Sequence, residues 1–110
     1  MALLYSRYED FSQDVTSNTP PILRFFGFKM HPSVQEFLDT HTKGDKGGVS
    51  STFRDSKTAP YHWKKDLPFK RILEIQKDCT EALKAWGYFI YESEDQLEGV
   101  HSVTNYTLLP

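Results

Sequence analysis

Residues 66–86 read DLPFKRILEIQKDCTEALKAW and carry the strongest structural signal in the chain. Apolar side chains recur every three or four residues along this stretch, at Ile72, Ile75, Cys79, Leu83 and Trp86. That spacing predicts an amphipathic helix that buries one face, Cys79 included. Gly87 follows directly, and we expect it to end the helix in a left-handed conformation.

Two shorter helices are predicted upstream of this one. Pro20 and Pro21 suit the first turn of a helix that ends at Gly27. Pro32 opens the next helix, in which Ser33 and Glu36 have the spacing of a capping box. The apolar face of that helix would consist of Val34, Phe37, Leu38 and His41.

The remaining segments are predicted to be strands or loops. Ala2–Tyr8 is short enough for a buried strand, although a helical turn has a similar pattern, and Tyr88–Tyr91 suits a second short strand. Lys43–Ser51 contains three glycines among charged residues and serines, which predicts a mobile loop. A lone strand leaves backbone groups unpaired, so we expect the chain to be the C-terminal part of a larger α/β domain.

Length and composition exclude several classes of protein. The chain has 110 residues, a net charge of −2, one cysteine and 38% hydrophobic residues. This length suits one small domain, and the single cysteine excludes an internal disulfide and a cysteine-rich zinc site. No apolar run is long enough to span a bilayer. The near-neutral charge argues against nucleic-acid binding, and the four histidines lack the spacing of a metal site.

Positive charge is concentrated in the middle of the chain. Between Lys43 and Arg71 there are eight basic residues against three acidic ones, whereas residues 92–98 contain four acidic residues and no basic one. This pattern is compatible with a solvated loop followed by an acidic tail. It is also compatible with a small anion-binding site on the middle segment.

Four stretches resemble motifs of sulfotransferases that use 3′-phosphoadenosine-5′-phosphosulfate (PAPS), and they follow the order of that superfamily. They are Leu4–Phe11 (LYSRYEDF), Leu23–Gly27 (LRFFG), Ser51–Ser56 (STFRDS) with Trp63-Lys64 and Leu67, and Ile75–Cys79 (IQKDC) with Ala85–Tyr88 (AWGY). The third is similar to the C-terminal nucleotide-binding segment. The fourth is similar to a helix of the Golgi carbohydrate sulfotransferases, which act on galactose or N-acetylglucosamine in glycans such as keratan sulfate.

This resemblance implies a fold and an enzyme class. The fold would be a P-loop-like α/β domain with a parallel sheet and flanking helices, mostly helical in residues 3–91. Residues 92–110 would form a polar, poorly ordered tail. The resemblance implies a sulfotransferase of class EC 2.8.2. The family's phosphate loop and usual acid/base residue are not in this sequence, so we assign no catalytic residue and expect the chain alone to be inactive.

The resemblance also implies PAPS-binding residues. They are Arg54, Ser56, Ser51, Thr52, Trp63 and Lys64. Arg54 would hold the 3′-phosphate, because a guanidinium group can donate two parallel hydrogen bonds to it. Other interpretations stay open: an exposed loop arginine, a tryptophan that packs on the following helix, and a solvated lysine pair. No metal is implied.

Several further residues have structural interpretations. We favour capping or pairing roles for Glu9 and Asp10, and a packed position for His41 on its helix. In the intact family member, the resemblance implies that Cys79 pairs with an upstream cysteine. Asn105-Tyr106-Thr107 is a glycosylation sequon, which is consistent with the Golgi lumen.

The predicted function is therefore that of a carbohydrate sulfotransferase fragment. Its partners would be a glycan acceptor and the missing N-terminal half of the domain, on the luminal side of the Golgi membrane, with the membrane anchor outside this sequence. One alternative is a fragment of a cytosolic-type sulfotransferase that acts on small hydroxyl compounds. The Arg54-Asp55-Ser56 sequence and the fourth motif argue against it. The other alternative is a helical interaction module without a nucleotide site.

Overall fold

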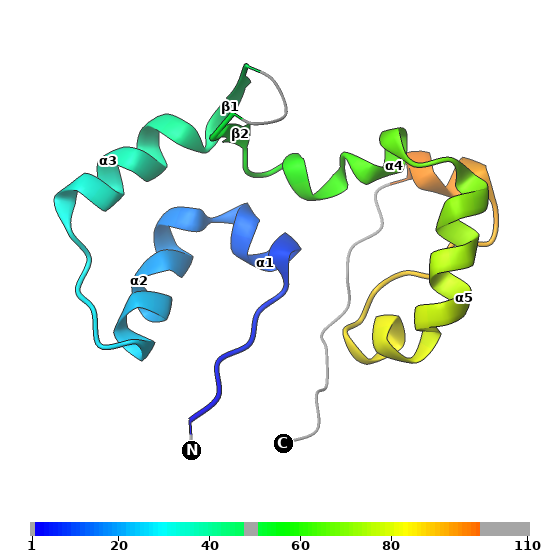
Figure 1. The fold of residues 1–110 in the computed structure, drawn as a ribbon, viewed down its shortest axis with the longest axis horizontal. Coiled ribbons are helices and arrows are strands. Elements are labelled where there is room, and N and C mark those ends of the chain that lie inside the picture. The colour runs from blue at the N-terminus through cyan, green and yellow to red at the C-terminus, as the bar shows by residue number, and fades with distance from the viewer. Residues whose placement is uncertain (1, 48–50, 100–110) are drawn as a thin grey trace. The chain divides into compact units, whose positions relative to one another are not determined.

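The computed structural model describes residues 2–47 and 51–99, which belong to two compact units divided between His62 and Trp63 (Figure 1). Helices predominate in both, as the sequence predicted.

The first unit contains three helices followed by a hairpin. The helices are α1 (Tyr8–Gln13), α2 (Val15–Phe25) and α3 (Pro32–His41). Strand β1 (Lys43–Lys46) pairs with β2 (Phe53–Asp55) in antiparallel orientation, with Lys43 opposite Asp55 and Lys46 opposite Phe53. A short 3-10 helix, η1 (Ala59–Tyr61), follows.

The second unit is built around one long helix. A four-residue helix, α4 (Trp63–Asp66), precedes α5 (Phe69–Ala85), and a 3-10 helix, η2 (Glu94–Glu98), follows an irregular segment. Gly87 has a φ of 73° after the end of α5, so the predicted left-handed stop is confirmed. Ser93 and Gln96 form a capping box at η2, within the segment expected to be a poorly ordered tail. The rest of that tail, with His101 and the Asn105 sequon, lies outside the described residues.

Both upstream helices exist, but their starts differ from the prediction. Helix α2 begins at Val15 because the Asp14 side chain caps it, accepting a hydrogen bond from the Ser17 amide at 3.1 Å. Pro20 and Pro21 therefore lie inside the helix. The two carbonyls that lose amide donors to these prolines belong to the exposed residues 16 and 17, where water can bind them.

The predicted ends of these helices fare differently. Gly27 has a φ of 81°, which confirms the predicted stop of α2. At α3 the prediction that Ser33 is the capping residue of a capping box was wrong. His31 caps the helix, because its ring Nδ1 accepts from the Ser33 amide at 3.1 Å.

The strand predictions were largely wrong. Residues 2–7 and 88–91 form no regular element, and Leu3, Leu4 and Tyr5 are exposed. The predicted loop over Lys43–Ser51 instead contains β1, because residues 43–46 find a pairing partner in residues 53–55. Within the described residues, the sheet is this antiparallel pair. The parallel sheet and P-loop implied by the resemblance are not seen there.

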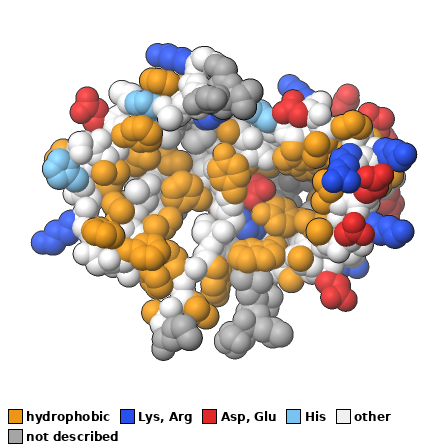
Figure 2. Space-filling model, in the orientation of Figure 1, with side chains coloured by type: hydrophobic (Ala, Val, Ile, Leu, Met, Phe, Trp, Pro, Cys, Tyr) orange, Lys and Arg blue, Asp and Glu red, His pale blue; other side chains and the backbone are white. Residues whose placement is uncertain are grey.

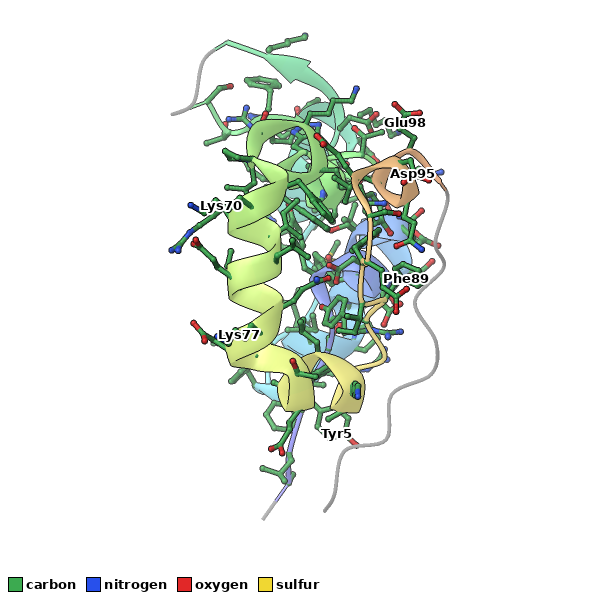
Figure 3. All side chains as sticks on the ribbon, turned by 90° about the vertical axis from the view of Figure 1, so that its right-hand side faces the viewer. Tyr5, Lys70, Lys77, Phe89, Asp95 and Glu98 are labelled. Atoms are coloured by element: carbon green, nitrogen blue, oxygen red, sulfur yellow. The ribbon has the colours of Figure 1, made fainter. Side chains whose placement is uncertain are left out.

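The buried face of α5 also differs from the predicted stripe. Ile72 is 4% exposed and Gln76 is buried beside it, whereas Ile75 is 39% exposed and Cys79 is exposed. The backbone leaves helical geometry at Cys79 (φ −116°, ψ 16°), so the stripe does not continue along one face. Lys70 and Lys77 project on the side of α5 away from Phe89 (Figure 3).

Candidate functional site

An aromatic stack positions strand β2 in the first unit. The His41 ring lies between two phenylalanine rings, with centroids 4.1 Å from Phe37 and 4.0 Å from Phe53, nearly parallel to both. The Lys46 ammonium lies 5.3 Å from the centroid of Phe53. The stack ties β2 to α3, and the predicted packed position of His41 is confirmed.

Arg54 lies in the middle of β2, next to this stack. Its side chain is half-buried, and its Nη1 donates a hydrogen bond to the Phe53 carbonyl at 2.6 Å. A guanidinium group carries N–H donors in one plane, and two of them can match two phosphate oxygens. Because Arg54 lies on a strand, the backbone that carries its guanidinium group has a defined position.

The turn after β2 is fixed by backbone contacts. The Ser56 amide donates to the Thr42 carbonyl at 2.8 Å, which connects the turn to the end of α3. The Asp55 carboxylate accepts from the Lys57 amide at 3.2 Å, and the Asp55 carbonyl accepts from the Thr58 amide at 3.2 Å. Asp55, which stands beside the predicted anion site, thus shapes the turn.

The predicted hydroxyl donors flank Arg54 within the same segment. The Ser51 hydroxyl oxygen accepts from the Phe53 amide at 3.1 Å, whereas Thr52 is exposed and Ser56 is half-buried. Four of the six predicted site residues thus belong to one short segment of the first unit, in which they are neighbours in the sequence. Charged and hydroxyl donors of this kind suit a phosphate group.

The other two predicted residues, Trp63 and Lys64, belong to the second unit. The Trp63 ring meets the Tyr91 ring edge-on, with centroids 5.9 Å apart and planes at 74°. The Lys64 ammonium lies 5.5 Å from the Tyr91 centroid. Both side chains are half-buried, so each is packed in part and accessible to solvent in part.

The sequence prediction missed the residues that hold this cluster. Tyr91 is 6% exposed, and its backbone is bound by the side chain of Gln76. Gln76 belongs to the stretch Ile75–Cys79 that resembles the sulfotransferase helix, which was a signal without an assigned role. Nothing in the Tyr88–Tyr91 sequence indicated its contact with α5.

Arg7 has a structural role in the first unit. Its buried guanidinium group binds the Asp10 carboxylate at two points, Nε to Oδ2 at 2.7 Å and Nη2 to Oδ1 at 3.2 Å. The predicted pairing of Asp10 is confirmed. Glu9 lies in the first turn of α1, where a negative charge favours the helix.

Within residues 2–47 and 51–99, no three histidine, cysteine, aspartate or glutamate side chains are grouped so that they could hold a metal ion. No helix in these same ranges has the length and apolar character required to cross a membrane.

Comparison with known proteins gives several relatives of one kind. The chain is 29% identical to human carbohydrate sulfotransferase 3 over 74% of its length and 30% identical to mouse carbohydrate sulfotransferase 5 over 80%. The chain is similar to carbohydrate sulfotransferases. Carbohydrate sulfotransferase 3 of Tetronarce californica is 31% identical over 77% of the chain.

The match covers a small part of each relative. The chain spans 18%, 24% and 20% of the lengths of these three carbohydrate sulfotransferases, in the order given. No family model and no solved structure matches the chain. The general kind of function is thus supported by sequence similarity to much longer enzymes.

Proposed function

We propose that this chain supplies the C-terminal part of a carbohydrate sulfotransferase that transfers a sulfuryl group from PAPS to a glycan hydroxyl. PAPS supplies the activated sulfuryl group, and the glycan oxygen takes it and loses its proton, while adenosine 3′,5′-bisphosphate leaves. The observation that carries the proposal is the similarity over 74% and 80% of the chain to carbohydrate sulfotransferases 3 and 5, respectively. It favours this function over that of a cytosolic-type enzyme.

Arg54 is the proposed contact for the 3′-phosphate. The chemistry of the donors in its segment fits a dianionic group, since Arg54 shares residues 51–56 with the hydroxyl-bearing Ser51, Thr52 and Ser56. The Asp55 carboxylate accepts the Lys57 amide, which engages one of its oxygens within the turn. A fixed turn would hold these donors in place before the phosphate arrives.

Trp63 and Lys64 are the proposed nucleotide contacts of the second unit. A half-buried tryptophan offers a ring surface to a base, and a lysine ammonium group offers a positive charge to a phosphate. Their packing on Tyr91 leaves each with a defined position.

The remainder of the sulfotransferase domain is the proposed partner. Many large apolar side chains of the described residues are exposed, among them Phe26 at 63% and Phe28 at 64%, and Figure 2 shows apolar side chains spread over the first unit. Apolar surface on this scale usually packs against another protein surface. We place the complete enzyme on the luminal side of the Golgi membrane, where a glycan acceptor would meet it.

A chimeric enzyme tests this proposal. In mouse carbohydrate sulfotransferase 5, the segment that aligns with this chain would be replaced by the chain itself. We expect the chimera to transfer labelled sulfate from PAPS to the parent enzyme's acceptor, and the parent without the segment to transfer none. A chimera that folds and reaches the same compartment as the parent but transfers no sulfate would contradict the proposal and favour an interaction module.

A further inference from the structure

The side chain of Gln76 and the backbone of Tyr91 form a two-bond clamp in the second unit. The Gln76 Nε2 donates to the Tyr91 carbonyl at 2.9 Å, and the Tyr91 amide donates to the Gln76 Oε1 at 2.7 Å. One side-chain amide thus satisfies both backbone groups of one residue, as a neighbouring strand would do in a sheet.

The clamp is buried, so water does not replace it. Gln76 is 8% exposed and Tyr91 is 6% exposed. Residues 88–91 form no regular element, and their backbone has no sheet to bind it. A buried backbone group that loses its hydrogen-bond partner destabilises the structure around it. The position of Tyr91 on α5 therefore depends on Gln76.

The ring of Tyr91 supports the two proposed nucleotide contacts. Trp63 meets it edge-on at 5.9 Å, the Lys64 ammonium lies 5.5 Å from its centroid, and Phe89 meets it at 4.8 Å and 69°. Rings in such arrangements attract each other, and an ammonium group is attracted to a ring face. Gln76 thus acts on Trp63 and Lys64 through one intermediate side chain.

We infer that Gln76 is a positioning residue, which holds Trp63 and Lys64 in place for the nucleotide by clamping Tyr91 to α5. The nucleotide in this inference rests on the proposed function. The positioning of Trp63 by the clamp does not rest on the proposed function. Each of these two parts of the inference is tested by its own measurement.

Acrylamide quenching of Trp63 fluorescence in the full chain tests both parts. A Trp86→Phe background leaves Trp63 as the one tryptophan, and far-UV circular dichroism checks that the helices persist. We expect adenosine 3′,5′-bisphosphate to protect Trp63 from acrylamide in this background. Gln76→Met keeps the side-chain length and removes both hydrogen bonds. It should increase quenching without the nucleotide and raise the nucleotide concentration needed for protection on the order of tenfold.

Further variants complete the test. Gln35→Met is the matched control, because Gln35 is a half-buried helical glutamine that binds Asp39 in the first unit, and it should change neither measurement. Gln76→Glu keeps the acceptor for the Tyr91 amide and, as a carboxylate, loses the donor to its carbonyl. It should increase quenching at least as much as Gln76→Met, because a buried carboxylate oxygen then faces the Tyr91 carbonyl. Gln76→Asn, whose side chain is one methylene shorter, replaces Gln76→Met if that variant loses its helical signal.

The outcomes separate the two parts. Unchanged quenching in a folded Gln76→Met, Gln76→Asn or Gln76→Glu variant would overturn the clamp's hold on Trp63. Increased quenching with unchanged nucleotide protection would overturn the positioning role. Absence of protection in the Trp86→Phe background would overturn the nucleotide contact and the role given to Gln76 with it. If Gln76→Met still increased quenching in that background, the clamp's hold on Trp63 would stand and the proposed function would be the part that is wrong.

Discussion

The two units hold their candidate site segments by different means. In the first unit, ring stacking between Phe37, His41 and Phe53 and backbone hydrogen bonds of the following turn fix the segment around Arg54. In the second, a buried side-chain amide fixes Tyr91, on which Trp63 rests. The first arrangement depends on apolar contact at a part-exposed surface, and the second on polar groups shielded from water. Substitutions should therefore affect the two units in different ways.

The largest expected effect on stability concerns the buried face of α5. Ile72→Ala should lower the free energy of unfolding of the second unit by about 2–5 kcal/mol, because it leaves a cavity beside the clamp. The matched variant Ile75→Ala should lower it by less than about 1 kcal/mol, because Ile75 is already 39% exposed. Urea unfolding followed by the helical signal at 222 nm measures both. Equal effects would mean that α5 buries the stripe predicted from the sequence instead.

A smaller effect is expected from the ring stack of the first unit. Phe53→Ala removes the ring that joins β2 to His41, a contact of the kind that contributes about 0.5–1.5 kcal/mol beyond the area it buries. Amide hydrogen exchange of residues 43–46 and 53–55 should become faster, since the hairpin loses its tie to α3. Phe28→Ala, at an exposed position, is the control and should leave these rates unchanged. Equal exchange rates in Phe53→Ala and Phe28→Ala would show that the hairpin is stable without the ring stack.

The smallest effect is expected at the start of α2. Hydrogen bonds from Ser17, and beyond them the charge of Lys57, lower the pKa of Asp14 below its ordinary value of 3.8. A carboxyl group with a lowered pKa stabilises the folded state above its unfolded pKa, and this contribution is lost as the pH falls through the folded pKa. The helical signal of α2 should therefore weaken in acid below the ordinary pKa.

Asp14→Asn separates the cap from the charge at this position. An asparagine oxygen can still accept the Ser17 amide but does not titrate, so this part of the acid-induced loss should disappear. An unchanged acid transition in Asp14→Asn would assign that transition to other carboxyl groups.

The sequence predicted the elements that depend on local interactions. Helix α5, the core of α3 and the stops at Gly27 and Gly87 follow from periodicity and from the conformational freedom of glycine, and the structure confirms them. The start of α2 was missed because Pro20 and Pro21 predict a first turn at their own position, whereas the helix begins directly after its cap, Asp14. The hairpin was missed because Lys43–Lys46 has the composition of a loop, and its strand character comes from pairing with residues 53–55.

The candidate site was predictable only in part. The motif around Arg54 and the pair Trp63-Lys64 were found from the sequence, and their roles in binding PAPS stay predictions. The supports of these residues were not predictable. Gln76 and Tyr91 are separated by irregular chain, and the periodicity of α5 assigned the buried face to Ile75 and Cys79. A hydrogen bond between a side chain and the backbone of a residue far along the chain produces no periodic pattern in the sequence.

The most direct test of the central proposal is the KM for PAPS in the chimeric sulfotransferase that carries this chain. Arg54→Ala should raise it on the order of 10–100-fold, because a charge-assisted contact to phosphate contributes about 1.5–3 kcal/mol. Arg54→Lys should recover part of the loss, since lysine keeps the charge without the two-pronged geometry. Lys57→Ala, an exposed lysine in the same turn, should have only a small, salt-sensitive effect.

In all three variants the KM for the acceptor glycan should stay close to that of the unsubstituted chimera, because the 3′-phosphate lies at the end of the nucleotide away from the transferred group. An Arg54→Ala chimera with an unchanged KM for PAPS would contradict the account. So would one whose KM values for PAPS and acceptor rise by the same factor.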